Sequence, residues 1–350
     1  MLLKKLELHN FRNFKNNEFL FNPLFTLIIG ENSKGKTSIL EAIYFLTFGS
    51  GFRESKEAEL INLDNLKETW VGGEYISGDS KLKFKVVLRA SQNSVKKIFL
   101  IESTSKRHFQ YLQEQAKAVL FTPQQIDIIA GSPHKRRDYV DKVISSYDFE
   151  YKKRLNNYEN ALRKRNKILE RSSHLQNIDE EISFWNGFLL EQATYIAFKR
   201  EEYADFLNQN NTINSFEFKI IYLRNEFSKE RLEKYKELER KIKRTVIGPQ
   251  KEDFEIYIGS TDNEGKNVHK YGSRSEQRLS ILWLKLNEIK LLEKNFKIKP
   301  ILLFDDVFSE FDTKNKKLVI NLLKKYQAVA TTTEIEVLHL AEIPKSIIKL

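Results

Sequence analysis

A glycine-rich turn between an apolar run and a helical pattern constrains the fold of this chain more than any other feature. Residues 25–37 read FTLIIGENSKGKT, in which an apolar segment runs directly into Gly-x-x-x-x-Gly-Lys-Thr. A strand, this turn and a helix together are typical of a phosphate-binding loop, where backbone N–H groups converge on phosphate oxygens. The sequence therefore predicts an α/β fold that binds a nucleoside triphosphate.

The residue types of this loop indicate a nucleoside triphosphate and Mg²⁺ as its ligands. Gly30 and Gly35 allow the backbone to approach phosphate closely. Lys36 is expected to reach the β- and γ-phosphates and to act in catalysis, while the Thr37 hydroxyl is expected to hold Mg²⁺. The predicted nucleotide contacts of the loop are Gly30, Glu31, Asn32, Ser33, Lys34, Gly35, Lys36, Thr37 and Ser38.

Two adjacent aspartates provide the second half of the predicted site. Residues 300–306 read PILLFDD, an apolar strand with both carboxylates at its carboxyl end. Ligands collect at that end of the strands in an open α/β sheet. We expect Asp305 to hold Mg²⁺ and Asp306 to orient or deprotonate the attacking water. The alternative is a strand end closed by turn-forming aspartates.

The order of patterns along the chain predicts a divided nucleotide domain. Strand patterns surround the loop at 4–9, 18–21, 81–88 and 96–101. Between 134 and 247 the sequence has one glycine and no proline, and its apolar residues recur at helical spacing. Afterwards, strand patterns at 254–258, 301–305 and 327–332 alternate with helical patterns at 275–294 and 313–325. We expect an ATPase domain from 1–115 and 248–350, with a helical lobe at 116–247.

Charge and composition narrow the classes of partner. The net charge of +11, from 59 basic and 48 acidic residues, favours a polyanionic partner, with nucleic acid ahead of a membrane surface. Genome-wide bias toward lysine is the alternative. No apolar run is long enough for a membrane span or a signal peptide. The chain has no cysteine and no histidine cluster with metal-ligand spacing, which excludes disulfides and thiolate metal sites.

The helix expected to begin near residue 273 has two interpretations. Ser273-x-x-Glu276 is a capping box, which by itself indicates only a well-capped helix. The other interpretation is that Ser273 and the helix N-terminus receive a γ-phosphate from a second subunit. The segment Ser309–Asp312, which follows the two aspartates after two intervening residues, favours the second. This order resembles the signature helix, acidic strand and D-loop of ABC-type ATPases, so Ser273 and Asp312 join the predicted nucleotide contacts.

Further motifs make the resemblance more specific. Residues 8–14 (LHNFRNF), 131–141 (GSPHKRRDYVD) and 248–253 (GPQKED), with the segments above, resemble the RecF family of bacterial recombinational repair. The resemblance implies an ABC-type P-loop ATPase head with split halves and an inserted helical lobe. Arg12 resembles the family arginine near the nucleotide phosphates, although an exposed strand-end arginine is the alternative. Ser33 and Ser275 depart from the family pattern, which usually has glycine there.

The resemblance also implies a function. It implies a cytoplasmic, nucleoid-associated bacterial protein that forms an ATP-dependent homodimer, binds DNA at gaps or single-strand/double-strand junctions, and helps RecO and RecR load the recombinase. Hydrolysis of ATP is expected to be slow and to act as a switch. Either Gln124 or Gln125 is expected to serve as a Q-loop. The alternatives are another SMC-related ATPase, of the overcoming-lysogenization type, and a non-hydrolysing basic DNA scaffold.

Two basic clusters are the candidates for DNA contact. Lys135, Arg136 and Arg137 are expected in the first turn of a helix that Ser132 caps, where cations oppose the helix dipole and suggest an anionic partner. Arg163, Lys164 and Arg165 form the second cluster within the predicted lobe. A solvated helix face is the alternative for each.

Overall fold

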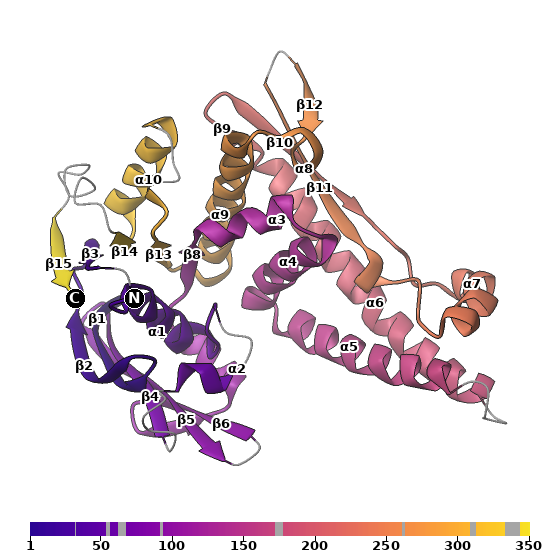
Figure 1. Ribbon diagram of the computed structural model, residues 1–350, viewed down its shortest axis with the longest axis horizontal. Coiled ribbons are helices and arrows are strands. Elements are labelled where there is room, and N and C mark those ends of the chain that lie inside the picture. Colours follow the sequence, from indigo (N-terminus) through magenta and orange to yellow (C-terminus); the bar gives the residue numbers. More distant parts are fainter. Residues whose placement is uncertain are drawn as a thin grey trace. The chain divides into compact units, whose positions relative to one another are not determined.

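The chain forms two compact units, which Figure 1 draws as a ribbon. The first unit comprises Met1–Gln124 and Glu288–Leu350, and the second comprises Gln125–Asn287. The computed structural model describes residues 1–31, 33–53, 57–61, 68–91, 94–171, 178–260, 263–308, 313–332 and 344–350. None of the helices in that part of the chain combines the length and apolar character that crossing a membrane requires.

An antiparallel sheet forms one layer of the first unit. Its strand order is β2-β1-β4-β5-β6-β7, so chain neighbours lie side by side except where β4 pairs with β1. The strands are β1 (Leu2–Phe11), β2 (Phe14–Leu20), β4 (Glu68–Ser77), β5 (Ser80–Ser91), β6 (Ser94–Ile101) and β7 (Thr104–Lys106). The strands predicted from the alternating patterns before and after the loop are therefore confirmed.

A parallel sheet of order β15-β3-β14-β13-β8 positions the predicted site. Its strands are β3 (Phe25–Ile29), β8 (Ala118–Phe121), β13 (Ile301–Asp305), β14 (Ala328–Thr332) and β15 (Lys345–Lys349). Residues of β8, β13 and β14 are buried along their whole length, as apolar parallel strands covered on both faces are. Strands β3 and β13 both run parallel to β14, which lies between them. Their carboxyl ends therefore lie at the same edge of the sheet, where the loop follows β3 and the aspartates end β13.

Helix α1 (Lys36–Phe48) follows the loop and lies in the core of the first unit. Its apolar residues Ile39, Leu40, Ile43, Phe45 and Leu46 are all fully buried. The reason is that α1 contacts strands of both sheets, so most of its circumference is covered. Helices α2 (His108–Glu114) and α10 (Thr313–Lys325) also belong to this unit, and α10 has its predicted bounds.

The second unit combines helices with a small antiparallel sheet of order β12-β11-β10-β9. Its helices are α3 (Asp127–Ala130), α4 (Pro133–Tyr147), α5 (Phe149–Glu170), α6 (Ile178–Gln209), α7 (Lys229–Ile242) and α8 (Val268–Tyr271). Its strands are β9 (Thr212–Ile213), β10 (Phe216–Leu223), β11 (Asp253–Ser260) and β12 (Asn263–Asn267). Helix α9 (Arg274–Phe296) starts in this unit and ends in the first.

The boundaries of the two units differ from the domain boundaries predicted from the sequence. The predicted lobe, 116–247, was expected to be helical and to begin before β8, but β8 pairs with β13 in the sheet of the first unit. At the other end, β11 pairs along its length with β10, so the residues up to Asn287 belong to the second unit. The physical reason is that β10 lies inside the predicted helical stretch and is the hydrogen-bonding partner of β11.

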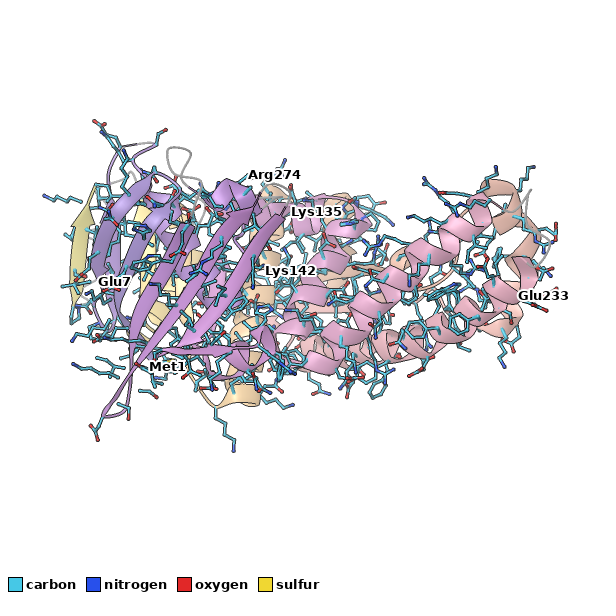
Figure 2. The ribbon with its side chains drawn as sticks, turned by 90° about the horizontal axis from the view of Figure 1, so that it is seen from below. Met1, Glu7, Lys135, Lys142, Glu233 and Arg274 are labelled. Atoms are coloured by element: carbon cyan, nitrogen blue, oxygen red, sulfur yellow. The ribbon has the colours of Figure 1, made fainter. Side chains whose placement is uncertain are left out.

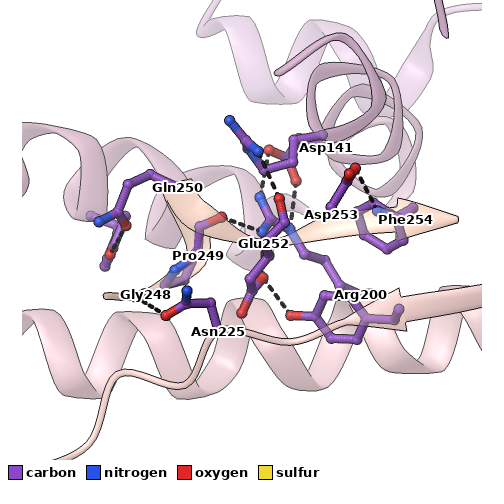
Figure 3. Close-up of polar contacts among 12 residues, drawn as sticks. Asp141, Arg200, Asn225, Gly248, Pro249, Gln250, Glu252, Asp253 and Phe254 are labelled. Atoms are coloured by element: carbon purple, nitrogen blue, oxygen red, sulfur yellow. Dashed lines mark hydrogen bonds and ion pairs between the residues drawn. The ribbon is translucent and has the colours of Figure 1, made fainter. Parts of the chain in front are cut away.

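The segment 248–253 is tied into a buried network of charges in the second unit (Figure 3). Arg200 of α6 is 2% exposed and donates from Nη1 to Glu252 Oε2 over 2.6 Å and to the Pro249 carbonyl over 2.9 Å. Its Nη2 donates to Asp141 Oδ2 over 2.9 Å. The backbone N–H of Gly248 donates to Asn225 Oδ1 over 3.2 Å. These contacts join α4, α6 and the start of β11.

Arg200→Ala is expected to lower the free energy of unfolding of the second unit by about 3–5 kcal/mol. The change would leave the Glu252 carboxylate, which is 1% exposed, without its guanidinium partner. Hydrogen exchange of backbone amides in denaturant, measured on peptides of the second unit, reports this loss.

The matched control is Arg154→Ala on α5. Arg154 pairs with Glu150 and Glu191, whose side chains are largely exposed. Exposed pairs contribute about 0–1 kcal/mol, so this variant should unfold almost as the wild type does. Equal losses for the two arginines would contradict the structural role assigned to Arg200.

Candidate nucleotide-binding site

A pocket of about 920 Å³ opens at the carboxyl edge of the parallel sheet in the first unit. This volume lies in the range of small-molecule sites. The lining combines the glycine-rich loop with arginines and the strand ends of the sheet. Its residues are Arg12, Asn13, Lys15, Ser33, Gly35, Lys36, Thr37, Ser38, Arg53, Glu59, Ile61, Asp306 and Thr331.

The loop lies beside the two aspartates at this pocket, whose lining includes Thr37 and Asp306. The hydroxyl of Thr37, in the first turn of α1, donates to Asp305 Oδ1 over 2.9 Å. Thr331, near the end of β14, donates from Oγ1 to the same oxygen, also over 2.9 Å. Burial raises the pKa of Asp305, and these hydrogen bonds oppose the rise without cancelling it. Segments 268 positions apart in the sequence therefore form one polar cluster.

The donor atoms of this cluster fit a magnesium ion. The Thr37 hydroxyl and the Asp305 carboxylate are hard oxygen ligands of the kind Mg²⁺ binds. Within the described ranges, no group of three or more histidines, cysteines or carboxylates is placed to hold a metal by itself. Such a sparse donor set suits Mg²⁺, which usually keeps several waters and takes other ligands from substrate phosphates.

Lys36 and the start of α1 offer positive charge to an anion. The Lys36 ammonium donates from Nζ to the carbonyl oxygens of Gly30, over 2.6 Å, and Glu31, over 2.9 Å. It therefore lies within the curve of the loop. Gly35 occupies the N-cap position, and the first turn of α1 contains no acidic residue. The amide groups at this helix end are available to an anion such as a phosphate.

Ser33 and Gly35, in the described part of the loop, have left-handed backbone. Gly35 has φ +101°, and a Cβ there would lie 2.5 Å from Asn13 Nδ2 and 2.8 Å from Phe14 Cζ. Ser33, which stands where the resembling family has glycine, has φ +68°. A residue with a Cβ is strained in this region by about 1–2 kcal/mol.

Substitutions at these two positions are expected to have opposite effects on the stability of the first unit. Ser33→Gly should raise the free energy of unfolding by about 1 kcal/mol, because it removes the backbone strain. Gly35→Ala should lower it by at least about 1–2 kcal/mol, because it adds both strain and a clash. Hydrogen exchange of backbone amides, measured on peptides of the first unit in denaturant, reports on this unit. A change of the same sign in both variants would contradict the assigned conformations.

A buried carboxylate anchors two arginines at the pocket. Glu41 of α1 is fully buried and accepts from Arg12 Nε and from Arg53 Nη2, each over 2.8 Å. Burial by itself would raise the pKa of Glu41, but the hydrogen bonds and charges of the arginines outweigh it and hold the pKa below its usual value. Arg12 was expected at the site from the sequence. Arg53 was not predicted. The one signal in the sequence was the Glu41 carboxylate in an apolar helix, because a buried carboxylate requires a cationic partner.

Asp306 combines an exposed carboxylate with a left-handed backbone, φ +53°. Its N–H donates to Thr331 Oγ1 over 3.1 Å. A residue held in this sparsely populated conformation is typical of functional sites, where the surrounding structure fixes it. The strand end thus presents one carboxylate inside the fold, from Asp305, and one at the pocket lining, from Asp306.

Other predicted nucleotide contacts lie elsewhere or outside the described residues. Ser273 belongs to the second unit and forms the predicted capping box: its Oγ donates to Glu276 Oε2 over 2.8 Å and accepts from the Glu276 N–H over 3.3 Å. Its role toward phosphate stays a prediction. Asn32 and Asp312 lie outside the described residues. Gln124 and Gln125 both lie in the short turn Pro123–Ile126, and the choice between them stays open.

The predicted DNA contacts divide into buried and exposed residues. Arg136 is buried and donates to Asp253 from Nε over 2.7 Å and from Nη2 over 2.9 Å. Arg165 is also buried, and its Nη2 lies 2.6 Å from Glu239 Oε2. Both were wrongly predicted as DNA contacts, because each guanidinium is committed to an internal carboxylate.

The remaining basic candidates are at least partly accessible. Lys135, which Figure 2 labels, is exposed in the first turn of α4, where Ser132 and Pro133 take the predicted N-cap and first helical positions. Arg137 is half-buried and donates to the Glu252 carbonyl over 2.6 Å. Arg163 and Lys164 are exposed on α5.

Comparison with known proteins shows similarity over nearly the whole chain. Residues 2–348 match the family described as "RecF/RecN/SMC N terminal domain". The "DNA replication and repair protein RecF" of Natranaerobius thermophilus is 30% identical over 96% of this chain and 92% of its own length. The protein of the same name from Caldanaerobacter subterraneus subsp. tengcongensis is 32% identical over 95% and 94%.

Solved structures give the same result. The "recombination mediator protein RecF-ATP in RecFOR pathway" matches with a TM-score of 0.85 at 30% identity, over 98% of this chain and 93% of that one. The Smc head domain of Pyrococcus furiosus matches with a TM-score of 0.54 at 19% identity, over 99% and 93%, which indicates a common fold.

Proposed function

The chain belongs to the RecF family of ABC/SMC-type ATPases, and from this premise we propose that it is an ATP-dependent DNA-binding protein of recombinational repair and replication-fork recovery. The observation that carries the proposal is the hydrogen bond between Thr37 and Asp305, which joins the end of the glycine-rich loop to the strand end that carries both aspartates. Thr37 and Asp306 both line one pocket. The solved relatives named as RecF with ATP support the choice of nucleotide.

Each part of the pocket takes one task in this proposal. The loop amides and Lys36 bind the phosphates, and Thr37 with Asp305 would hold Mg²⁺. When bound, the ion would supply positive charge that offsets the charge of the phosphates. Asp306 accepts the proton of the attacking water or orients it, and its carboxylate is one methylene shorter than glutamate. We therefore expect slow turnover that acts as a switch.

ATP is proposed to bring two copies of the chain together. Ser273, exposed at the N-terminus of α9, and Asp312 contribute to the nucleotide held by the other subunit. Closure of the dimer creates the DNA-binding state, and hydrolysis ends it. The DNA is proposed to be gapped or to contain a single-strand/double-strand junction, with Lys135, Arg137, Arg163 and Lys164 as candidate contacts. RecO and RecR are the proposed protein partners, in the bacterial cytoplasm at the nucleoid.

Sedimentation with and without ATP tests this proposal most directly. The protein is expected to be monomeric alone and dimeric with ATP, and the dimer is expected to bind gapped DNA more tightly than blunt duplex. Affinity for DNA should fall steeply with salt, because phosphate contacts release counterions. A monomer that stays monomeric with saturating ATP would contradict the dimer. A dimer that releases no phosphate would support a non-hydrolysing scaffold instead.

A further inference from the structure

A groove of about 520 Å³ lies between helices α5 and α6 of the second unit. The two helices are antiparallel, since Arg154 contacts Glu191 while Arg165 contacts Asn186. One wall of the groove is basic and the other is aromatic. The side chains that carry the argument are Arg163, Lys164 and Lys167 of α5, and Phe184, Trp185 and Phe188 of α6.

The aromatic wall presents ring surface that the hairpin itself does not cover. Phe184 is 67% exposed, although phenylalanine is usually buried. Trp185 packs edge-on against Phe184, with ring centroids 5.1 Å apart, and against Phe188, with centroids 6.1 Å apart. Three adjacent rings, each nearly perpendicular to the next, therefore present apolar faces and edges at the groove.

The basic wall carries more positive charge than nearby carboxylates balance, since Glu159 interacts at longer range with Arg163 alone among the three basic side chains in the described residues. Within the part of the chain that the structure describes, Arg163, Lys164 and Lys167 form no ion pair, whereas the nearby Arg165 pairs with Glu239. The Lys164 ammonium lies 4.8 Å from the centroid of the Trp185 ring, a cation–π contact. The groove therefore offers positive charge beside aromatic surface, and its charge is complementary to phosphate.

We propose that this groove binds a segment of single-stranded DNA, with an unpaired base stacked on the aromatic wall and the flanking phosphates on the basic wall. The inference rests on the proposed function, because it assumes that the chain binds DNA. Aromatic stacking with a cationic groove is the common recognition mode for single strands, because every unpaired base has a free ring face. Paired bases in a duplex hide those faces, so the aromatic wall should discriminate between the two forms.

Phe184→Ala tests the aromatic wall. In the presence of ATP, fluorescence anisotropy with a labelled oligo(dT) should show affinity about tenfold weaker than that of the wild type, since stacking on one aromatic side chain has an effect of this size. Affinity for a blunt duplex should be unchanged. The matched control is Phe198→Ala on the same helix, where the ring is 55% exposed but lies outside the groove lining, and its oligo(dT) affinity should equal that of the wild type.

Lys167→Gln tests the basic wall by a second measurement. Loss of one phosphate contact should reduce the slope of log affinity for oligo(dT) against log salt by about one unit or less. Photocrosslinking with 5-iododeoxyuridine in the oligonucleotide should label the peptide that carries Phe184 and Trp185.

The outcomes separate this inference from the function on which it rests. If the wild type binds neither gapped nor single-stranded DNA, the proposed function fails. If the wild type binds gapped DNA but Phe184→Ala binds oligo(dT) as tightly as the wild type, only the groove inference is overturned. Equal losses for oligo(dT) and duplex, or crosslinks confined to other peptides, would also overturn it and leave an acidic protein segment as the occupant to test.

Discussion

Lys36→Ala is expected to abolish ATP-dependent dimerisation. The ammonium group lies within the glycine-rich loop, where it donates to the carbonyls of Gly30 and Glu31, and it is the buried cation expected to contact the phosphates. Losing a charge-assisted contact of this kind costs about 3 kcal/mol, or about a hundredfold in affinity for ATP. Calorimetry measures the binding, and sedimentation with ATP measures the dimer.

The control for this variant is Lys81→Ala, which removes an exposed lysine of β5 from the same unit. Lys81 contributes the same charge but does not line the pocket, so its variant should bind ATP and dimerise like the wild type. Dimerisation of the Lys36 variant at the wild-type concentration of ATP would contradict the proposed role of the pocket in bringing two copies together.

Much of the first unit could be predicted because its signals are local. The apolar strand, glycine-rich turn and helix are consecutive, and the strand before Asp305 is an uninterrupted apolar run. The parallel order of the sheet then brings the ends of β3 and β13 to one edge. Strand β10 was missed because it lies in a glycine-poor stretch with helical spacing, and its partner β11 lies beyond helix α7. Such non-local pairing leaves little trace in a single sequence.

Prediction from the sequence has the same limit for the side chains of the candidate sites. A run of basic residues does not reveal which of them are buried, because the deciding partners are distant: Asp253 is 117 positions from Arg136, and Glu239 is 74 from Arg165. Neighbours in the same runs, such as Lys135 and Lys164, remain exposed. Helical geometry separates adjacent residues onto different faces, so one member of a charged run can anchor the fold while the next meets solvent.

Asp306→Asn is expected to leave ATP binding intact and to slow hydrolysis by at least about a hundredfold, the usual effect of removing a general base. Asparagine keeps the size of the side chain and tolerates the left-handed backbone, φ +53°, about as well as aspartate does. The N–H bond to Thr331 can therefore persist, and the Asp305 cluster is untouched. The variant should accumulate as an ATP-bound dimer on DNA.

Single-turnover phosphate release and sedimentation over time measure the two effects together. Asp79→Asn, in the exposed turn between β4 and β5, makes the same chemical change away from the pocket and should hydrolyse ATP at the wild-type rate. The two variants should then have opposite effects on the dimer. The Lys36 variant should not form it, and the Asp306 variant should form it but not dissociate. If the Asp306 variant turned over at the wild-type rate, its carboxylate would have no part in activating water, and the switch would need another base.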